Sequence, residues 1–258
     1  MLDPIQYLLG ALSGSLVGFS LGLVGGGGSI LAVPLIVYLV GVPSPHMAIG
    51  TSALVVAANA ATGLASHARA RTVKWRCGVI YAAAGIVGAL LGSTAGKAFD
   101  GQKLLFLFAL VMVGVGIVML RGRKGGGDPA AQCNRQNAPK VSGFGFLTGL
   151  FAGFFGIGGG FLIVPGLVAS TRMPMINAVG TSLVAVTAFG LTTALNYALS
   201  GLVDWPLATI FIVGGVAGGV SGTMLARRLS GTGALTTVFS GLIFVVAAYM
   251  LWKSATAI

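Results

Sequence analysis

Long apolar segments alternate with short polar ones along almost the whole chain. Most of these segments approach or exceed the roughly 20 residues that an α-helix needs to cross the hydrocarbon core of a bilayer. The pattern therefore predicts an all-α polytopic membrane protein. The expected spans are Ile5–Val42, which contains a glycine break, Met47–Ala65, Cys77–Ala95, Leu104–Leu120, Phe144–Val168, Ile176–Leu199, Pro206–Ala226 and Leu235–Trp252.

Glycine runs interrupt the first apolar segment of each half. Gly25–Gly28 are consecutive, and Gly158–Gly160 form a second run. A glycine weakens a helix by roughly 1 kcal/mol relative to alanine, so each run predicts a turn at membrane depth, where irregular backbone must be buried in protein or face water. The half-helix after each turn would present free N–H groups, which favour an anion together with the helix dipole.

Close helix packing is the alternative explanation of these glycines. It accounts well for glycines spaced four residues apart, such as Gly10, Gly14 and Gly18, because such spacing places small residues on one helix face. A contiguous run covers every face of a helix, so packing alone does not require it. We therefore interpret the spaced glycines as packing faces and the two runs as turns beside a binding site.

The two halves of the chain repeat each other in order. The stretch GFSLGLVGGGGSILAVP (Gly18–Pro34) matches GLFAGFFGIGGGFLIVP (Gly149–Pro165), and AIGTS (Ala48–Ser52) matches AVGTS (Ala178–Ser182). Internal repeats of this size are common in secondary transporters. We expect a first transmembrane repeat (1–121), a cytoplasmic linker (122–140) and a second transmembrane repeat (141–258). Each repeat should contain a glycine-broken or re-entrant helical hairpin followed by three transmembrane helices.

The charge distribution favours an inverted relation between the repeats. The chain has 15 Lys and Arg against four acidic residues, and most of the basic residues flank the apolar segments, as the positive-inside rule expects for cytoplasmic loops. No nucleic-acid partner is therefore needed to explain the net charge. If the broken segments fold back and the repeats are inverted, all basic residues but Lys97, Lys103 and Lys253 face the cytoplasm. If each broken segment instead crossed the membrane once, the basic residues would be divided less clearly between the two sides of the membrane.

Hydroxyl side chains recur at one place in each repeat. The GTS elements (Gly50–Ser52 and Gly180–Ser182) lie about one turn into the helix after the broken segment, and their hydroxyls could donate to an oxyanion. Alternatively, they bond back to carbonyls of their own helix. The predicted substrate-binding residues are Gly25, Gly26, Gly27, Gly28, Ser29, Thr51, Ser52, Gly158, Gly159, Gly160, Thr181 and Ser182.

Three further polar residues are candidate pathway residues. Asn59, His67 and Asn196 lie in or near predicted spans, where polar side chains are costly and often mark a pathway. None has the same residue type at the matching position of the other half. Interhelical hydrogen bonding is therefore expected for the two asparagines, and a position at the membrane interface for the histidine.

The sequence lacks the residues that some functions require. There is no glutamate, and all four aspartates fall in loops or at chain ends, so a cation substrate would lack a counter-charge inside the membrane. An anion suits what remains. No catalytic set is evident, so an enzyme is not expected. Cys77 and Cys133 are far apart and lack metal-ligand spacing, so we expect no disulfide, metal site or cofactor.

The motifs together resemble those of the sulfite exporter TauE/SafE family, also called TSUP permeases. The resemblance rests on GxGGGxxxVP, at Gly25–Pro34 and Gly156–Pro165, with GTS downstream in each half; Ser29 departs from it where the second half has Gly160. It implies a bacterial or archaeal inner-membrane permease that moves a small sulfur-containing anion, such as sulfite or an organosulfonate. An anion channel of the same fold and a non-transporting assembly factor are the alternatives. Lipid is the other expected partner, and the oligomeric state is open.

Overall fold

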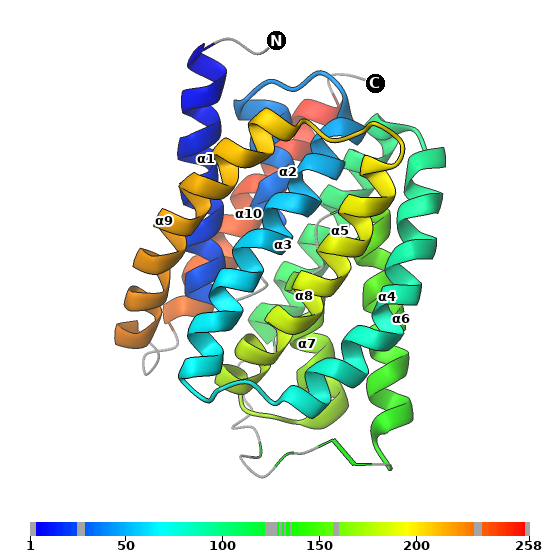
Figure 1. Ribbon diagram of the computed structural model, residues 1–258, viewed down its shortest axis with the longest axis vertical. Helices are drawn as coiled ribbons and strands as arrows, with labels where there is room; N and C mark the ends of the chain where they lie inside the picture. Colours follow the sequence, from blue (N-terminus) through cyan, green and yellow to red (C-terminus); the bar gives the residue numbers. More distant parts are fainter. Residues whose placement is uncertain are drawn as a thin grey trace.

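The computed structural model describes residues 4–24, 29–121, 128, 131, 133–134, 136–156, 160–229 and 234–255. Within these ranges the regular structure is helical, as predicted (Figure 1). The first half contains α1 (Pro4–Val24), α2 (Ala32–Pro34) with the π-helix Leu35–Leu39, α3 (Pro45–Arg69), α4 (Trp75–Ala98) and α5 (Gly101–Arg121). The second half contains α6 (Ala138–Phe155), α7 (Gly160–Thr171), α8 (Met175–Ala198), α9 (Trp205–Leu229) and α10 (Ala234–Ala255).

Several of these helices are long and apolar enough to cross a membrane. Among the described residues this holds for five helices, which are α1, α3, α4, α8 and α9. The prediction of a multi-pass membrane protein is confirmed. Each predicted broken segment contains a long helix followed by a shorter one. In the first half α1 precedes the short helical stretch Ser29–Leu39, and in the second half α6 precedes the 12-residue α7.

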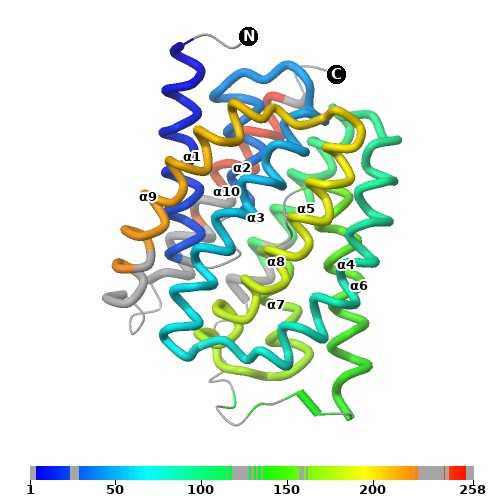
Figure 2. Tube along the Cα trace, in the orientation of Figure 1, coloured from blue at the N-terminus to red at the C-terminus, as the bar shows by residue number. Residues whose placement is uncertain are grey.

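Equivalent helices of the two halves run in opposite directions. The N–H of Asp204, just before α9, donates to Thr51 near the start of α3 (3.0 Å). The N–H of Lys74, just before α4, donates to Thr181 near the start of α8 (2.9 Å). The α8–α9 loop therefore lies at the end of the bundle where α3 begins, and the α3–α4 loop lies at the other end, where α8 begins (Figures 1 and 2). An inverted repeat requires this geometry, and inversion across a membrane stays a prediction.

Two glycine contacts, which we call the glycine seams, join a helix of one half to a helix of the other. Gly18 of α1 faces Gly215 of α9, and Gly149 of α6 faces Gly85 of α4. A Cβ atom at Gly18 or Gly149 would overlap the backbone of its partner. The spaced glycines thus serve close helix packing, as predicted. Each seam therefore packs one half against the other.

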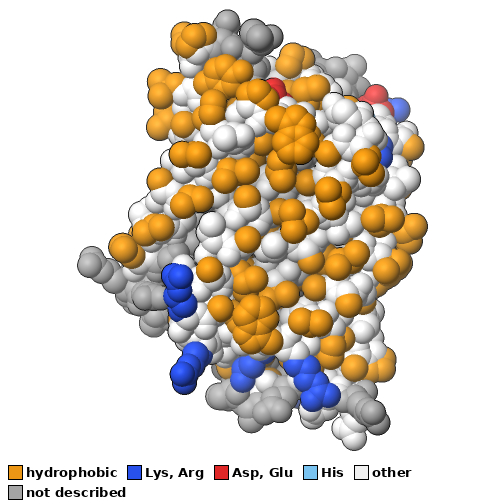
Figure 3. All heavy atoms as spheres, in the orientation of Figure 1, with side chains coloured by type: hydrophobic (Ala, Val, Ile, Leu, Met, Phe, Trp, Pro, Cys, Tyr) orange, Lys and Arg blue, Asp and Glu red, His pale blue; other side chains and the backbone are white. Residues whose placement is uncertain are grey.

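Positive charge gathers at the end of the bundle that holds the α3–α4 loop and the linker, here called the basic end (Figure 3). Arg71 and Arg172 there have left-handed backbone, with φ of 55° and 58°. Their equivalents at the opposite end are Gly201 and Gly41, with φ of 69° and 81°. The left-handed conformation costs a non-glycine residue roughly 1–2 kcal/mol. At the basic end, arginine thus occupies positions where glycine would be less strained. Basic residues at this end are what the positive-inside rule predicts for a cytoplasmic face.

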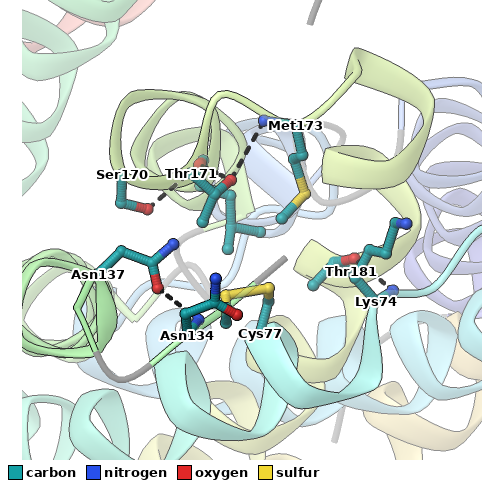
Figure 4. The surroundings of a disulfide bond; sticks show 10 residues. Lys74, Cys77, Asn134, Asn137, Ser170, Thr171, Met173 and Thr181 are labelled. Carbon is teal, nitrogen blue, oxygen red and sulfur yellow. Dashed lines mark hydrogen bonds between the residues drawn. A yellow bond between two sulfur atoms is a disulfide. The ribbon is translucent and has the colours of Figure 1, made fainter. Parts of the chain in front are cut away.

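The two cysteines form a disulfide, so the prediction of no disulfide was wrong. Cys77 lies in the first turn of α4 and Cys133 in the linker, with Cα atoms 5.3 Å apart and a sequence separation of 56. The linker folds against the helix bundle here (Figure 4). The N–H of Asp128 donates to the carbonyl of Arg172 (2.8 Å). Cysteine spacing alone could not reveal a contact that depends on this fold of the linker.

The disulfide lies at the basic end, which the positive-inside rule predicts to be cytoplasmic, and thiols in the cytoplasm are kept reduced. We therefore expect Cys77 and Cys133 to be reduced in intact cells and to pair rapidly after oxidant is added. Acid quenching of cells, followed by alkylation with a high-mass maleimide in denaturant, reads the thiol state as a gel shift. The Cys77→Ser variant provides the unpaired reference. Full oxidation in untreated cells would place this end outside the cytoplasm.

The glycine seams predict a strong response to side-chain volume. Gly18→Leu and Gly149→Leu should each lower the unfolding free energy by about 1–3 kcal/mol or more, because the added side chain overlaps a helix backbone. Thermal unfolding in detergent measures the loss. Gly143→Leu is the matched control, since nothing lies within 4 Å of a Cβ atom built at Gly143. Equal stability of all three variants would refute the packing role.

Candidate functional site

The second broken segment begins at a glycine turn. Helix α6 ends at Phe155 and is capped by Gly156, which has φ of 66° and donates its N–H to the carbonyls of Ala152 and Gly153. A Cβ atom at Gly156 would overlap the side chain of Ile49 on α3. Glycine is thus required twice here, for the left-handed turn and for the close approach of the other half.

Some predicted site residues lie outside the described residues. These are Gly25, Gly26, Gly27 and Gly28 in the first half, and Gly158 and Gly159 in the second. Ser29 and Gly160 are described, and both are buried at the start of the helical stretch after each gap. In the second half a regular helix, α7, begins at Gly160. In the first half the stretch from Ser29 consists of a 3-10 turn, the three-residue α2 and the π-helix Leu35–Leu39. The role of these two stretches in binding an anion stays a prediction.

The GTS element of the first half contacts the broken segment of the second. The Ser52 hydroxyl lies 2.8 Å from the carbonyl oxygen of Ile49 and 3.1 Å from that of Gly156, and it can donate its single proton to either. Ser182 donates to the carbonyl of Val179 (2.8 Å). Both serines thus bond back to their own helix, as the alternative explanation expects. When the Ser52 hydroxyl donates to Gly156 instead, it links the GTS element to the turn at Gly156.

The threonines and glycines of the GTS elements join the two halves. Thr51 and Thr181 accept hydrogen bonds from the backbone N–H groups just before α9 and α4, as described above. A Cβ atom at Gly50 would overlap the carbonyl oxygen of Leu202 in the α8–α9 loop. One at Gly180 would press on Thr72 in the α3–α4 loop. Sequence reasoning missed this structural role.

The three candidate pathway residues differ in their surroundings. Asn196 bonds across helices, because its Nδ2 donates to Ser93 (2.6 Å) and its Oδ1 accepts from Lys97 (2.9 Å), so that prediction is confirmed. Asn59 makes no such bond. Its amide nitrogen and oxygen are buried and have no hydrogen-bond partner in the described structure, which corrects the prediction for this residue.

His67 lies beside the α3–α4 loop at the basic end. Its Nδ1 is 2.9 Å from the Thr72 hydroxyl, consistent with the predicted interface position. Within the part of the chain that the structure describes, no three His, Cys, Asp or Glu residues gather in a way that could hold a metal ion.

The architecture is that of a multi-pass helical membrane protein with two interlocked halves, in each of which a long first helix is followed by a shorter helical stretch. The family model of the sulfite exporter TauE/SafE matches residues 10–250, and the chain belongs to this family. The resemblance found in the motifs is thereby confirmed. No solved structure matches the chain.

Relatives of the chain are named as transporters. It is 54% identical over 255 residues to a probable membrane transporter protein of Xylella fastidiosa (strain 9a5c), with 97% of both chains covered. It is 26% identical over 248 residues to the probable membrane transporter protein YunE of Bacillus subtilis (strain 168), covering 87% of this chain and 89% of YunE. The chain is accordingly a membrane transporter of the TauE/SafE family.

The contacts of the GTS threonines predict a stability loss that is the same in both halves. Thr51→Val and Thr181→Val keep the side-chain shape but leave a part-buried N–H without its acceptor, so each should cost about 1–3 kcal/mol. Unfolding in detergent measures the effect. Thr209→Val is the control, because the exposed Thr209 hydroxyl bonds only to its own helix, at Trp205. If neither variant lost more stability than Thr209→Val, the conclusion that these threonines join the two halves would be contradicted.

Proposed function

We propose that the protein is a secondary transporter that moves a small sulfur-containing anion, such as sulfite or an organosulfonate, across the cytoplasmic membrane. One observation carries the proposal. The GTS element of the first half packs, through Ile49 and Ser52, directly on the turn that opens the second broken segment at Gly156. Elements that are repeated in sequence thus meet across the two halves, where transporters with internal repeats hold their substrate.

The charges of the interior favour an anion. Among the described residues, Asp100, Asp128 and Asp204 all lie outside the helices, so no described helix contains a carboxylate. A cation inside the bundle would lack a counter-charge. An anion can instead be bound by the backbone N–H groups at the start of each half-helix and by the helix dipole. We assign these contacts to Gly25–Ser29 and Gly158–Gly160.

A cleft at the basic end has basic residues in its lining that would attract an anion. It has a volume of about 250 Å³ and lies beside the disulfide, with Lys74, Trp75 and Arg76 in its lining. Clefts lined by one sign of charge raise the local concentration of the opposite ion. Because this cleft is at the basic end, it would serve the cytoplasmic side. Movement of one half against the other around a central site would complete transport.

Uptake by purified protein in proteoliposomes tests the proposal. We expect saturable movement of at least one of sulfite, thiosulfate, sulfoacetate and taurine, with and without a pH gradient. Gly160→Leu should reduce the rate at least tenfold while the protein still inserts, because the side chain would crowd the start of α7. Gly143→Leu should transport like the wild type, since its side chain points into open space.

Three results would count against the proposal. Absence of movement for all four compounds would remove sulfur anions and favour a non-transporting role. Linear flux without saturation would indicate a channel of the same fold. Normal transport by Gly160→Leu would show that the broken segment does not bind the substrate.

A further inference from the structure

The disulfide joins two parts of the wall of the cleft at the basic end. Residues 73–77, around the start of α4, line this cleft together with Cys133 of the linker. Both cysteines are 1% exposed, and they belong to the same buried cluster as Met173 in the α7–α8 loop. Side chains from the end of α7 and the start of α8 surround the bond (Figure 4). One covalent bond therefore lies where several elements of the basic end meet.

The linker also contacts the second half at this end. The N–H of Asp128 donates to the carbonyl of Arg172, just after α7 (2.8 Å), and the N–H of Ala131 donates to the carbonyl of Asp128 (3.0 Å). Ala131 is buried. The described linker residues thus bond to the end of α7 in the second half, while Cys133 bonds to α4 in the first. The disulfide therefore makes the linker a bridge between the two halves at the basic end.

The opposite end of the bundle has no such bond, because the chain contains only two cysteines. Counting back from the matched seam glycines Gly85 and Gly215, Leu207 of α9 takes the position of Cys77. Leu207 is a fully buried packing residue. The hydrogen bonds of the GTS threonines, in contrast, hold the loops of both ends alike. The disulfide is thus an additional constraint on one end only.

The surroundings of Cys77 favour its reaction with an oxidant once it is reduced. Cys77 lies in the first turn of α4, where the positive end of the helix dipole favours a thiolate. Lys74 and Arg76 line the same cleft, and no acidic residue does. The thiolate is the form of cysteine that is oxidised most readily. The cleft, with a volume of about 250 Å³, is large enough to admit a small oxidant.

We propose that Cys77 and Cys133 form a redox-controlled site that closes the basic end of the transporter when hydrogen peroxide oxidises the two thiols. The Cys77 thiolate attacks one peroxide oxygen, the O–O bond breaks, and a sulfenic acid forms as hydroxide leaves. The Cys133 thiolate then attacks that sulfur, which forms the S–S bond and displaces a second hydroxide. The two thiol protons convert both hydroxides to water, and the two sulfur atoms supply the two electrons that the peroxide takes up.

Oxidation then affects transport through the cleft. Alternating access requires each end of the bundle to open in turn. The disulfide holds the linker to α4 across the cleft, so it favours the state that is closed at the basic end. A dithiol reverses the reaction, because its sulfur atoms return two electrons and become a disulfide themselves. The inference rests on the proposed function, since it takes opening of this cleft to be a step of transport.

Hydrogen exchange of the purified protein tests the closure without any substrate. Protein reduced with dithiothreitol is compared with protein oxidised by hydrogen peroxide, each freed of reagent. Exchange of the backbone amides of Lys74 and Asp128 should be at least tenfold slower after oxidation, because both amides donate hydrogen bonds to the second half at this end. The amide of Asp204, which makes the equivalent bond at the opposite end, is the matched control and should change less than twofold. Equal exchange in the two states would overturn the inference.

Uptake into proteoliposomes tests the effect on transport. Sulfite itself cleaves disulfides, so the probes are sulfoacetate and taurine, whose sulfur is not nucleophilic. The oxidised wild type should take up these probes at least tenfold more slowly than the reduced wild type, and dithiothreitol should restore the rate. The double variant Cys77→Ser/Cys133→Ser should transport like the reduced wild type before and after peroxide, which excludes oxidation of other residues as the cause.

The outcomes separate this inference from the proposed function. Uptake by the oxidised wild type within twofold of the reduced rate would overturn the inference while the proposed function stood. If the reduced wild type and the double variant moved no anion at all, the proposed function would fail. The exchange rates would then decide by themselves whether oxidation closes the basic end.

Discussion

The close approach of backbone to backbone between the two halves is the constraint on which the whole structure depends. At the glycine seams, helices from different halves come so near that a single Cβ atom would overlap the opposing chain. Inside a membrane there is no hydrophobic force to bring helices together, because lipid is as apolar as the side chains. Association then rests on packing and interhelical hydrogen bonds, which are strongest where small residues allow contact. Interlocking therefore makes each half depend on the other.

The same constraint sets the place of the candidate site. Gly50 at the start of α3 repeats the close approach to backbone, at the carbonyl of Leu202, while Gly180 and Gly156 leave room for the side chains of Thr72 and Ile49. Thr51 and Thr181 then fix the neighbouring loops by hydrogen bonds. Irregular backbone at membrane depth must be surrounded by protein or water. The turn at Gly156 meets this requirement because Ile49 and Ser52 of the other half pack on it. The proposed transport depends on this break between helices, and the packing of the other half around it makes the break tolerable inside a membrane.

Much of this fold could be predicted from the sequence, because glycine spacing and apolar length report directly on helix packing and bilayer thickness. The helical class, the repeat of the motifs, the packing faces and the turn at Gly156 all follow from such local signals. Contacts set by the path of the chain could not be predicted. The disulfide depends on how the linker folds against α4. Asn59 was expected to bond across helices, yet whether an amide finds a partner depends on the packing of three other helices around it. The hydroxyls of the GTS elements were recognised as important, but their bonds to carbonyls and loop N–H groups appear only in three dimensions.

The measurement that tests the central claim most directly is an experimental structure with bound selenite, a heavier analogue of sulfite that can be located by anomalous scattering. The account predicts a selenium peak inside the bundle, between the glycine-broken segment of one half and the GTS element of the other. Peaks confined to the protein surface or to the polar linker, with the bundle interior empty at saturating selenite, would contradict it.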